Sequence, residues 1–152
     1  MKSLILTIIL SILLLGCGFK SIYSSKNSNF EIVEIKNKNK NRNSFSVEKM
    51  VMLLSNQDAA RKVKLEMEYK HSISTILKDN KGDPSKKKLT IIVNLQVKNE
   101  KDNILTSKNF KEEFSYKVQS DKFNMSQYED NITSNLNNKI SNDIIFLLGT
   151  FE

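Results

Sequence analysis

The sequence predicts an α+β domain, a two-layer sandwich in the order β-α-β-β-β-α, with two helices packed on one face of a four-stranded, mostly antiparallel sheet. Two patterns carry this prediction. Three long segments alternate apolar and polar residues with a period of two, as strands with one buried face do. The last segment repeats apolar residues at every fourth position, as a helix with one apolar stripe does. A chain of 152 residues is long enough for one such domain.

Four segments are expected to form the sheet. Phe30–Ile35 is a short first strand rich in apolar residues. The other three strands are longer and span Val63–Leu77, Leu89–Lys98 and Ile104–Gln119. Turn-forming residues at 79–84 and 98–103 separate these strands. The unit formed by the first strand, the first helix and the second strand should cross over right-handed.

The alternation assigns one side of each long strand to the core. The expected inward rows are Val63, Leu65, Met67, Tyr69, Ile73 and Leu77; then Leu89, Ile91, Val93, Leu95 and Val97; then Phe110, Phe114, Tyr116 and Val118. Glu112 interrupts the third row, which indicates an edge strand or a bulge. The other sheet face is polar, and we expect it to be exposed and able to serve as a docking surface.

The first helix is predicted to run to about Ser55, with Ser44 or Ser46 as its N-cap. Its buried face has the spacing i, i+3, i+4, i+7 and comprises Val47, Met50, Val51 and Leu54.

The last helix is predicted to begin with a capping box formed by Ser126 and Glu129 and to stop at Gly149. Its apolar stripe comprises Tyr128, Ile132, Leu136, Ile140, Ile144 and Leu148. A helix with one such stripe needs a surface to cover, and the sheet provides it.

The N-terminus has the pattern of an export signal. Lys2 precedes an apolar run of twelve residues from Leu4 to Leu15, which falls short of the roughly 20 residues that span a bilayer. Gly16 and Cys17 follow, and Cys17 is the only cysteine of the chain. The run up to Cys17 resembles the lipobox of bacterial lipoproteins, in which the thiol receives a diacylglyceryl group and a peptidase cuts just before the Cys.

We therefore predict a lipoprotein signal peptide over residues 1–16, a lipidated Cys17 with a tether over residues 17–29, and an α+β domain over residues 30–152. The alternative is an uncleaved anchor helix that contains a cysteine. Attached acyl chains contribute about 0.8 kcal/mol per buried methylene, so a Cys with two or three chains would hold the protein on a membrane.

The net charge of +7 admits several anionic partners, but export argues against nucleic acid. Of the 24 cations, only Arg42 and Arg61 are arginines, whereas phosphate recognition favours the bidentate guanidinium. Lys81, Lys86, Lys87 and Lys88 surround the expected turn between the second and third strands. Charge runs of this kind are usually solvated loops, which is the alternative interpretation of this cluster.

We expect no enzyme, no metal and no cofactor. His71 is the only histidine and lies in a predicted strand beside Tyr69, where a structural role is expected. The sequence contains no second His or Cys for a metal site, no Gly-rich phosphate loop and no nucleophile elbow.

The residues from Gly16 to Tyr23 read Gly-Cys-Gly-Phe-Lys-Ser-Ile-Tyr, which resembles the Gly-Cys-Gly-Phe-x-Pro-Leu-Tyr opening of LPS-assembly lipoproteins, the LptE family, in its alphaproteobacterial form. Ser21 stands where Pro is usual, and Ile22 replaces Leu. Gly18 occupies the position at which an Asp retains lipoproteins in the inner membrane, so the resemblance implies the outer membrane.

The resemblance also implies a fold and a function. The family has a β-α-β-β-β-α sandwich that plugs and supports the outer-membrane β-barrel LptD and helps lipopolysaccharide reach the cell surface. Its members bind lipopolysaccharide through cations at one end of the domain. By this analogy Lys81, Lys86, Lys87 and Lys88 are the expected ligand-binding residues, because lipid A phosphates attract cations.

Three other hypotheses remain open. The first is a free-standing periplasmic lipid-binding lipoprotein module with no barrel partner. The second is a hydrolase that uses paired carboxylates, and the third is a Lys-rich surface that binds anionic polymer or lipid without selectivity. Strong salt dependence without selectivity would mark the third.

Overall fold

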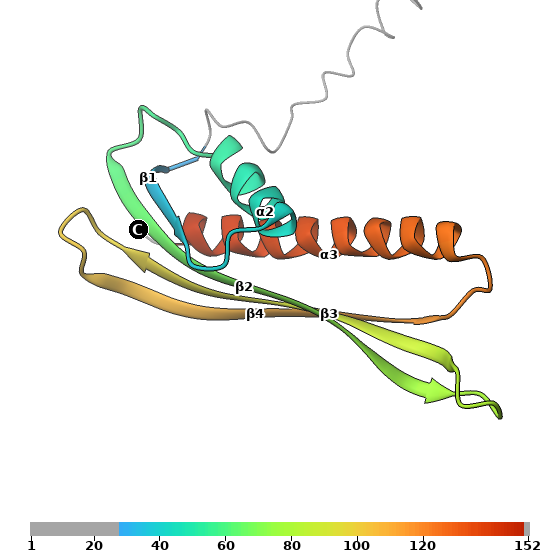
Figure 1. Cartoon of the computed structure of the whole chain (residues 1–152). Helices are drawn as coiled ribbons and strands as arrows, with labels where there is room; N and C mark the ends of the chain where they lie inside the picture. Colours follow the sequence, from blue (N-terminus) through green and yellow to red (C-terminus); the bar gives the residue numbers. More distant parts are fainter. Residues whose placement is uncertain (1–27, 151–152) are drawn as a thin grey trace, which may run out of the picture.

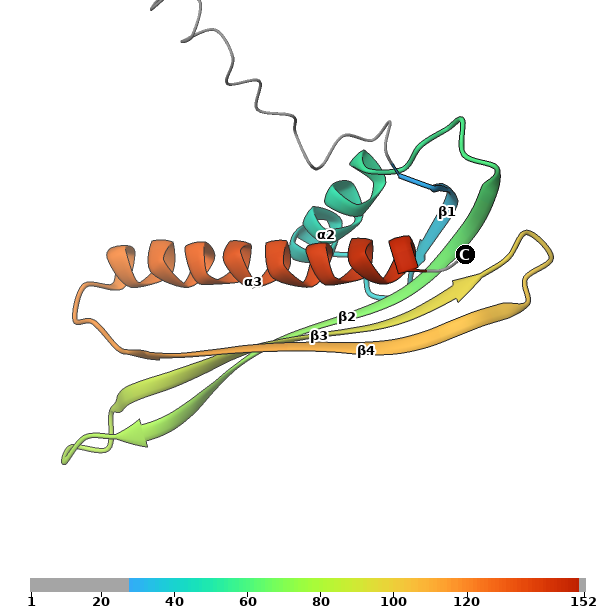
Figure 2. The same ribbon diagram turned by 180° about the vertical axis from the view of Figure 1, so that it is seen from behind.

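The computed structural model describes residues 28–150, which form a four-stranded sheet covered on one face by two helices. The elements are β1 (Phe30–Asn37), α2 (Arg42–Leu53), β2 (Arg61–Lys78), β3 (Pro84–Lys98), β4 (Ile104–Lys117) and α3 (Lys122–Thr150). Figures 1 and 2 show both helices on the same side of the sheet. The predicted fold class and element order are confirmed.

The strands lie in the order β1-β2-β3-β4, and only the first pair is parallel. A parallel pair needs a crossover connection, and α2 provides it. The strand β4 forms one edge, in agreement with the interruption that Glu112 makes in its apolar row. Each long strand extends beyond the predicted bounds at one end or both, except β4, which ends at Lys117 instead of Gln119.

The core lies between the helices and the sheet. The stripe of α3 is buried at Ile132, Leu136, Ile140, Ile144 and Leu148, while Tyr128 is 36% exposed. The row of β3 from Leu89 to Val97 is no more than 2% exposed, as the alternation predicted. Arg61 fixes one end of this layer, since its guanidinium donates to the carbonyl of Leu148 near the end of α3.

The predicted inward row of β2 is wrong beyond Tyr69. Ile73 and Leu77 are 40% and 56% exposed, because the β2–β3 hairpin continues past the helical layer (Figures 1 and 2). A register shift between Thr75 and Leu77 also places Leu77 opposite Lys86, and the period of two is lost there. Phe114 pairs with Leu89 on the helix-facing side but lies on the edge strand β4 and is 43% exposed.

Both predicted helix starts are also wrong. Asn41 is the N-cap of α2: its Oδ1 accepts from the Ser44 amide at 2.9 Å, and Ser44 Oγ accepts from the Asn41 amide at 2.9 Å. Ser44 is therefore the partner in a capping box and not the cap. In α3, Asp121 Oδ1 accepts from the backbone amides of Phe123 and Asn124, and Asp121 lies five residues before the predicted cap Ser126. Gly149 does not stop α3, which continues to Thr150.

One polar contact ties the two layers together inside the core. The Tyr69 hydroxyl donates to Asn137 Oδ1 at 3.0 Å. The side-chain Nδ2 of Asn137 donates in turn to the backbone carbonyl of Asn43 at 3.3 Å. Burial raises the pKa of Tyr69 to about 12, so the hydroxyl keeps its proton at neutral pH. This chain of contacts links β2, α3 and the first turn of α2.

We expect Tyr69→Phe to destabilise the fold by about 1–3 kcal/mol, because it leaves the buried Asn137 Oδ1 without its donor. Urea unfolding followed by circular dichroism measures the effect. Tyr128→Phe is the matched control, since Tyr128 lies at the surface with 36% exposure. Equal losses in the two variants would show that the buried hydrogen bond is unimportant.

Candidate functional site

The β2–β3 hairpin is the part of the domain that projects farthest from the helices (Figure 1). Residues 71–84 are all exposed, including the large apolar side chains of Ile73, Ile76 and Leu77. Exposed apolar residues beside cations form an amphipathic surface, which matches the chemistry of a glycolipid better than that of a purely polar ligand.

The turn of this hairpin is fixed by Asp79. Its Oδ1 accepts from the backbone amides of Lys81 and Asp83, both at 2.9 Å, and Gly82 adopts a φ of +87° that favours glycine. The Asp79 amide in turn donates to the Asp83 carbonyl at 2.8 Å. The backbone of Lys81 is therefore held in place while its side chain remains exposed.

The structure places the four predicted lysines at one end of the hairpin but not on one face. Lys81 lies in the turn, whereas Lys86, Lys87 and Lys88 lie in β3 and alternate between the two faces of the sheet. Lys87 points toward the helices and pairs with Glu129 of α3 at 3.4 Å. Lys88 pairs with Glu113 on the open face at 3.3 Å. Only Lys81 and Lys86 form no ion pair within residues 28–150.

Glu129 has a different role from the predicted helix cap. Its Oε1 accepts from the Tyr116 hydroxyl at 2.6 Å and from Lys87. The pKa of Tyr116 lies well above its usual range, mainly because the phenol is buried and also because it donates to this carboxylate. Lys87 therefore belongs to a contact that holds α3 against β3 and β4, and is not a free cation.

Two further cations lie at the same end and were missed from the sequence. Lys117 is the register partner of Lys86, and Lys78 is the last residue of β2, directly before Asp79. Like charges directly opposite each other on neighbouring strands are unfavourable unless an anion lies nearby. We call Lys78, Lys81, Lys86 and Lys117 the hairpin cluster; none of them forms an ion pair in the described part of the chain. The strand register could have revealed Lys117, but the sequence alone does not give that register.

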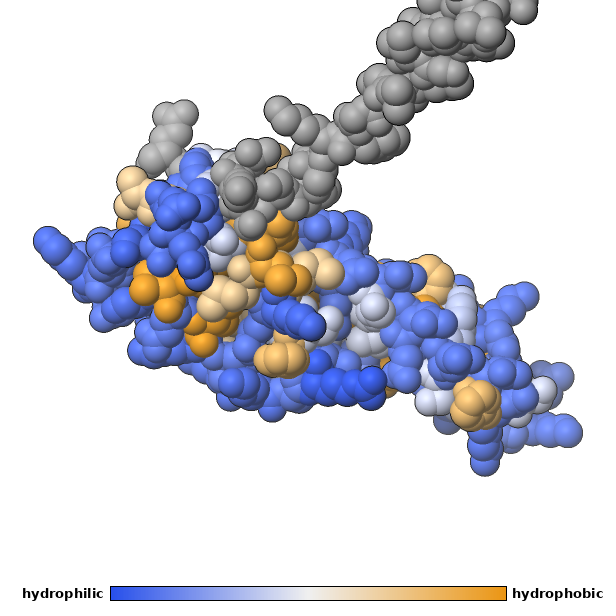
Figure 3. Space-filling view, turned by 90° about the horizontal axis from the view of Figure 1, so that it is seen from above, coloured by the Kyte–Doolittle hydropathy of each residue, from blue (hydrophilic) through white to orange (hydrophobic). Residues whose placement is uncertain are grey.

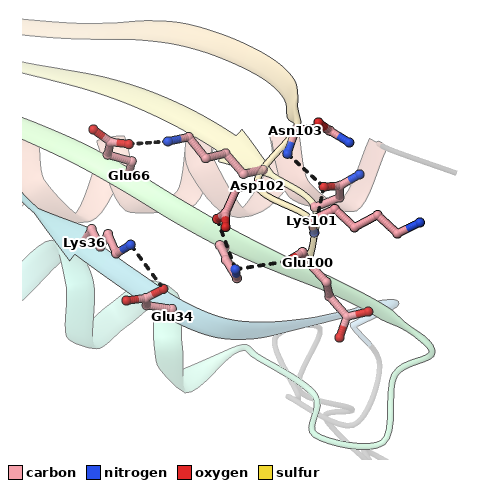
Figure 4. A network of polar contacts seen from close by, with 10 residues as sticks. Glu34, Lys36, Glu66, Glu100, Lys101, Asp102 and Asn103 are labelled. Atoms are coloured by element: carbon pink, nitrogen blue, oxygen red, sulfur yellow. Dashed lines mark hydrogen bonds and ion pairs between the residues drawn. The ribbon is translucent and has the colours of Figure 1, made fainter.

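The open face of the sheet carries a different pattern, in which cations alternate with carboxylates. Its ion pairs include Lys62–Glu31 at 3.3 Å, Lys64–Asp102 at 3.0 Å, Lys70–Glu68 at 2.9 Å and Lys111–Glu113 at 2.9 Å. Figure 4 shows the part around the β3–β4 turn, where Glu34, Lys36, Glu66 and Asp102 lie close together. Many lysines of this face thus have carboxylate partners, in contrast to those of the β2–β3 turn.

Glu66 is the centre of this network. It accepts from Lys38 at 2.7 Å and from Lys98, and these two contacts hold its pKa at about 2. The carboxylate links β2 to β3 and to the segment after β1.

The remaining sequence predictions concern catalysis and anchoring. No group of three or more His, Cys, Asp or Glu residues that could hold a metal exists within residues 28–150. His71 lies exposed on β2 with Nε2 3.5 Å from Thr133 Oγ1, and the absence of an enzymatic activity stays a prediction. Cys17, the signal peptide and most of the tether lie outside the described residues. Among the helices that are described, none is both long and apolar enough to cross a membrane.

Solved structures with this fold include three bacterial lipoproteins. Rare lipoprotein B from Shewanella oneidensis aligns with a TM-score of 0.59 and 13% identity over 77% of this chain and 91% of that one. Lipoprotein B from Nitrosomonas europaea aligns with a TM-score of 0.64 and 11% identity over 88% of this chain and 92% of that one. The minor lipoprotein from Acinetobacter baumannii aligns with a TM-score of 0.59 and 11% identity over 86% of this chain and 93% of that one. At these identities the comparison establishes a shared fold. The sequence matches no protein-family model and no curated protein.

We expect Glu66→Gln to remove a stabilising contact that depends on pH. Because the folded state lowers the pKa of Glu66 from 4.5 to about 2, its contribution is complete above pH 4.5 and is lost as the pH falls toward 2. The variant should be less stable than the natural chain at pH 7, and the difference should shrink between pH 4.5 and 2. Urea unfolding at several pH values measures it, with Glu100→Gln as the control; a constant difference would contradict the assignment.

Proposed function

We propose that this protein is an outer-membrane lipoprotein, anchored through Cys17 on the periplasmic face, that plugs and supports an LptD-type β-barrel in lipopolysaccharide transport and assembly. The observation that carries the proposal is the combination of two independent features. A Gly-Cys-Gly-Phe opening of lipoprotein type precedes a domain whose fold is shared with bacterial lipoproteins.

The open face of the sheet supports the proposal of a β-barrel partner. The interior of a large outer-membrane barrel is polar, so a plug needs a polar surface that stays soluble and avoids a strong charge of one sign. The alternating lysines and carboxylates of this face meet that requirement. Exposed ion pairs of this kind contribute only about 0–1 kcal/mol each to stability, so they can exchange partners at little cost.

The hairpin cluster supports the proposal that lipopolysaccharide is the ligand. Its four lysines lie at the same end of the hairpin as the exposed side chains of Ile76 and Leu77, and lipid A combines phosphates with acyl chains. Within the four lysines expected from the sequence, Lys81 and Lys86 are available for phosphates, whereas Lys87 and Lys88 already have carboxylate partners.

The barrel partner is tested by purification from native membranes. A C-terminal tag on the natural chain should recover a large β-barrel protein in equal amount after solubilisation in mild detergent. Cys17→Ala should lose acylation, as seen from the mass of the N-terminal peptide, and should leave the membrane fraction. Recovery of the acylated chain alone would contradict the plug and would favour the free-standing lipid-binding module.

The ligand is tested by two matched double variants. Lys81→Gln with Lys86→Gln should weaken lipopolysaccharide binding several-fold, because each lost exposed ion pair is worth about 0.2–1 kcal/mol. Lys87→Gln with Lys88→Gln removes the same charge but should affect binding less, since both residues are paired within the protein. Titration with lipopolysaccharide at fixed low salt measures both. Equal losses would show that only net charge matters.

A further inference from the structure

The helix α2 has a second apolar stripe that the core does not use. Val47 and Val51 face the sheet and are 0% and 2% exposed. Phe45, Met52 and Leu53 have the spacing i, i+7, i+8 on the outward side and are 54%, 44% and 65% exposed. A surface helix normally places polar residues on its outward side, so this second stripe needs another explanation.

An apolar groove of about 390 Å³ lies along this stripe, between α2 and β1, and Figure 3 shows apolar residues gathered on this side of the domain. Its lining residues are Ile35, Phe45, Glu48, Lys49, Met52 and Leu53. Glu48 accepts from the Asn37 side chain and is thus engaged inside the domain. Lys49 is exposed, and its long stem can place the ammonium group at the level of lipid headgroups.

The groove lies at the end of the domain where the anchored segment begins. The Asn56 side chain donates to the Ser28 carbonyl at 3.0 Å, and the Asn56 amide donates to the Phe30 carbonyl at 3.0 Å. Asn56 follows Leu53 by three residues, so the first described residue lies beside the end of α2. Cys17 is eleven residues before Ser28, and an extended chain of that length spans at most about 40 Å.

We propose that the outward face of α2 rests on the lipid bilayer that holds Cys17, with Phe45, Met52 and Leu53 inserted among the acyl chains. The proposal rests on the lipid anchor of the proposed function. A bilayer is the favoured occupant because the anchor keeps it within reach of this face whenever the domain is not inside a barrel, so that even a weak apolar contact is populated. A hydrophobic helix face of this kind enters the boundary between headgroups and chains.

A single fluorescent reporter tests the contact. The chain contains no tryptophan, so Phe45→Trp introduces the only indole, at a side chain that is already half exposed. Phe123→Trp is the matched control: Phe123 is 77% exposed and lies at the other end of α3 from Leu148, about 37 Å away. Both variants are made as the acylated full chain and reconstituted into phosphatidylcholine vesicles with and without bromine on the acyl chains.

Brominated chains should quench roughly half of the emission at position 45, because interfacial helices bury their apolar face about 5–10 Å deep. The emission at position 123 should change little. Equal quenching at the two positions, or none at position 45 in a chain that floats with the vesicles, would overturn the proposal while leaving the anchor intact. A chain that does not float, and whose Cys17 peptide lacks acyl mass, would instead refute the anchor itself.

The other occupants of the groove give distinct results. If the segment 18–27 covered it, the emission at position 45 would be blue-shifted without vesicles, and deletion of that segment would remove the shift. If a second copy covered it, the shift would depend on protein concentration. Either result overturns the bilayer contact. Leu53→Trp repeats the test at a second exposed position if Phe45→Trp lowers the yield of folded protein.

Discussion

The packing of α3 on one face of the sheet is the constraint on which the rest of this molecule depends. Its stripe from Ile132 to Leu148 is at most 9% exposed, and the facing row of β3 is completely excluded from water at Leu89, Ile91, Val93 and Val97. Because no second layer within residues 28–150 covers the other face, that face carries polar residues on every strand. Because β2 and β3 continue past the helices at their shared turn, the last residues of β2 and the first residues of β3 lose burial (Figure 2). The polar face and the exposed hairpin are thus two consequences of a single helical layer.

The features predicted correctly are those that depend on periodicity. A row of residues with a period of two or a stripe with a period near four reflects burial over many positions, and single exceptions do not erase it. The helix caps were missed because several cap-forming residues compete locally: Asn41, Asn43, Ser44 and Ser46 lie within six positions. The choice of Asn41 depends on a tertiary contact, since Ser44 Oγ also accepts from the Asn37 side chain at the end of β1 at 2.9 Å. No local pattern contains that information.

The candidate site was predicted only in part, again because local sequence patterns do not contain the tertiary arrangement. A run of three lysines attracts attention as a cluster, but residues in a strand alternate between its faces, so Lys86–Lys88 cannot act as one patch. This conclusion requires that β3 begins at Pro84, and no apolar alternation marks the strand there, because that part of the hairpin has no helix to cover it. Lys117 joins the cluster through the register of β4 on β3, which is set by turns and packing along the whole sheet.

The charge and the apolar surface are distributed along one axis of the domain. Carboxylates pair with many lysines of the open face, whereas the four lysines of the hairpin cluster have no ion-pair partner within residues 28–150. The start of β1 and the end of α2 lie at the opposite end of the molecule (Figure 1). A chain anchored before β1 would therefore carry its cationic hairpin at the other end of the domain. Under the proposed function, this arrangement would let one small domain be attached to lipid at one end and contact an anionic amphiphile at the other.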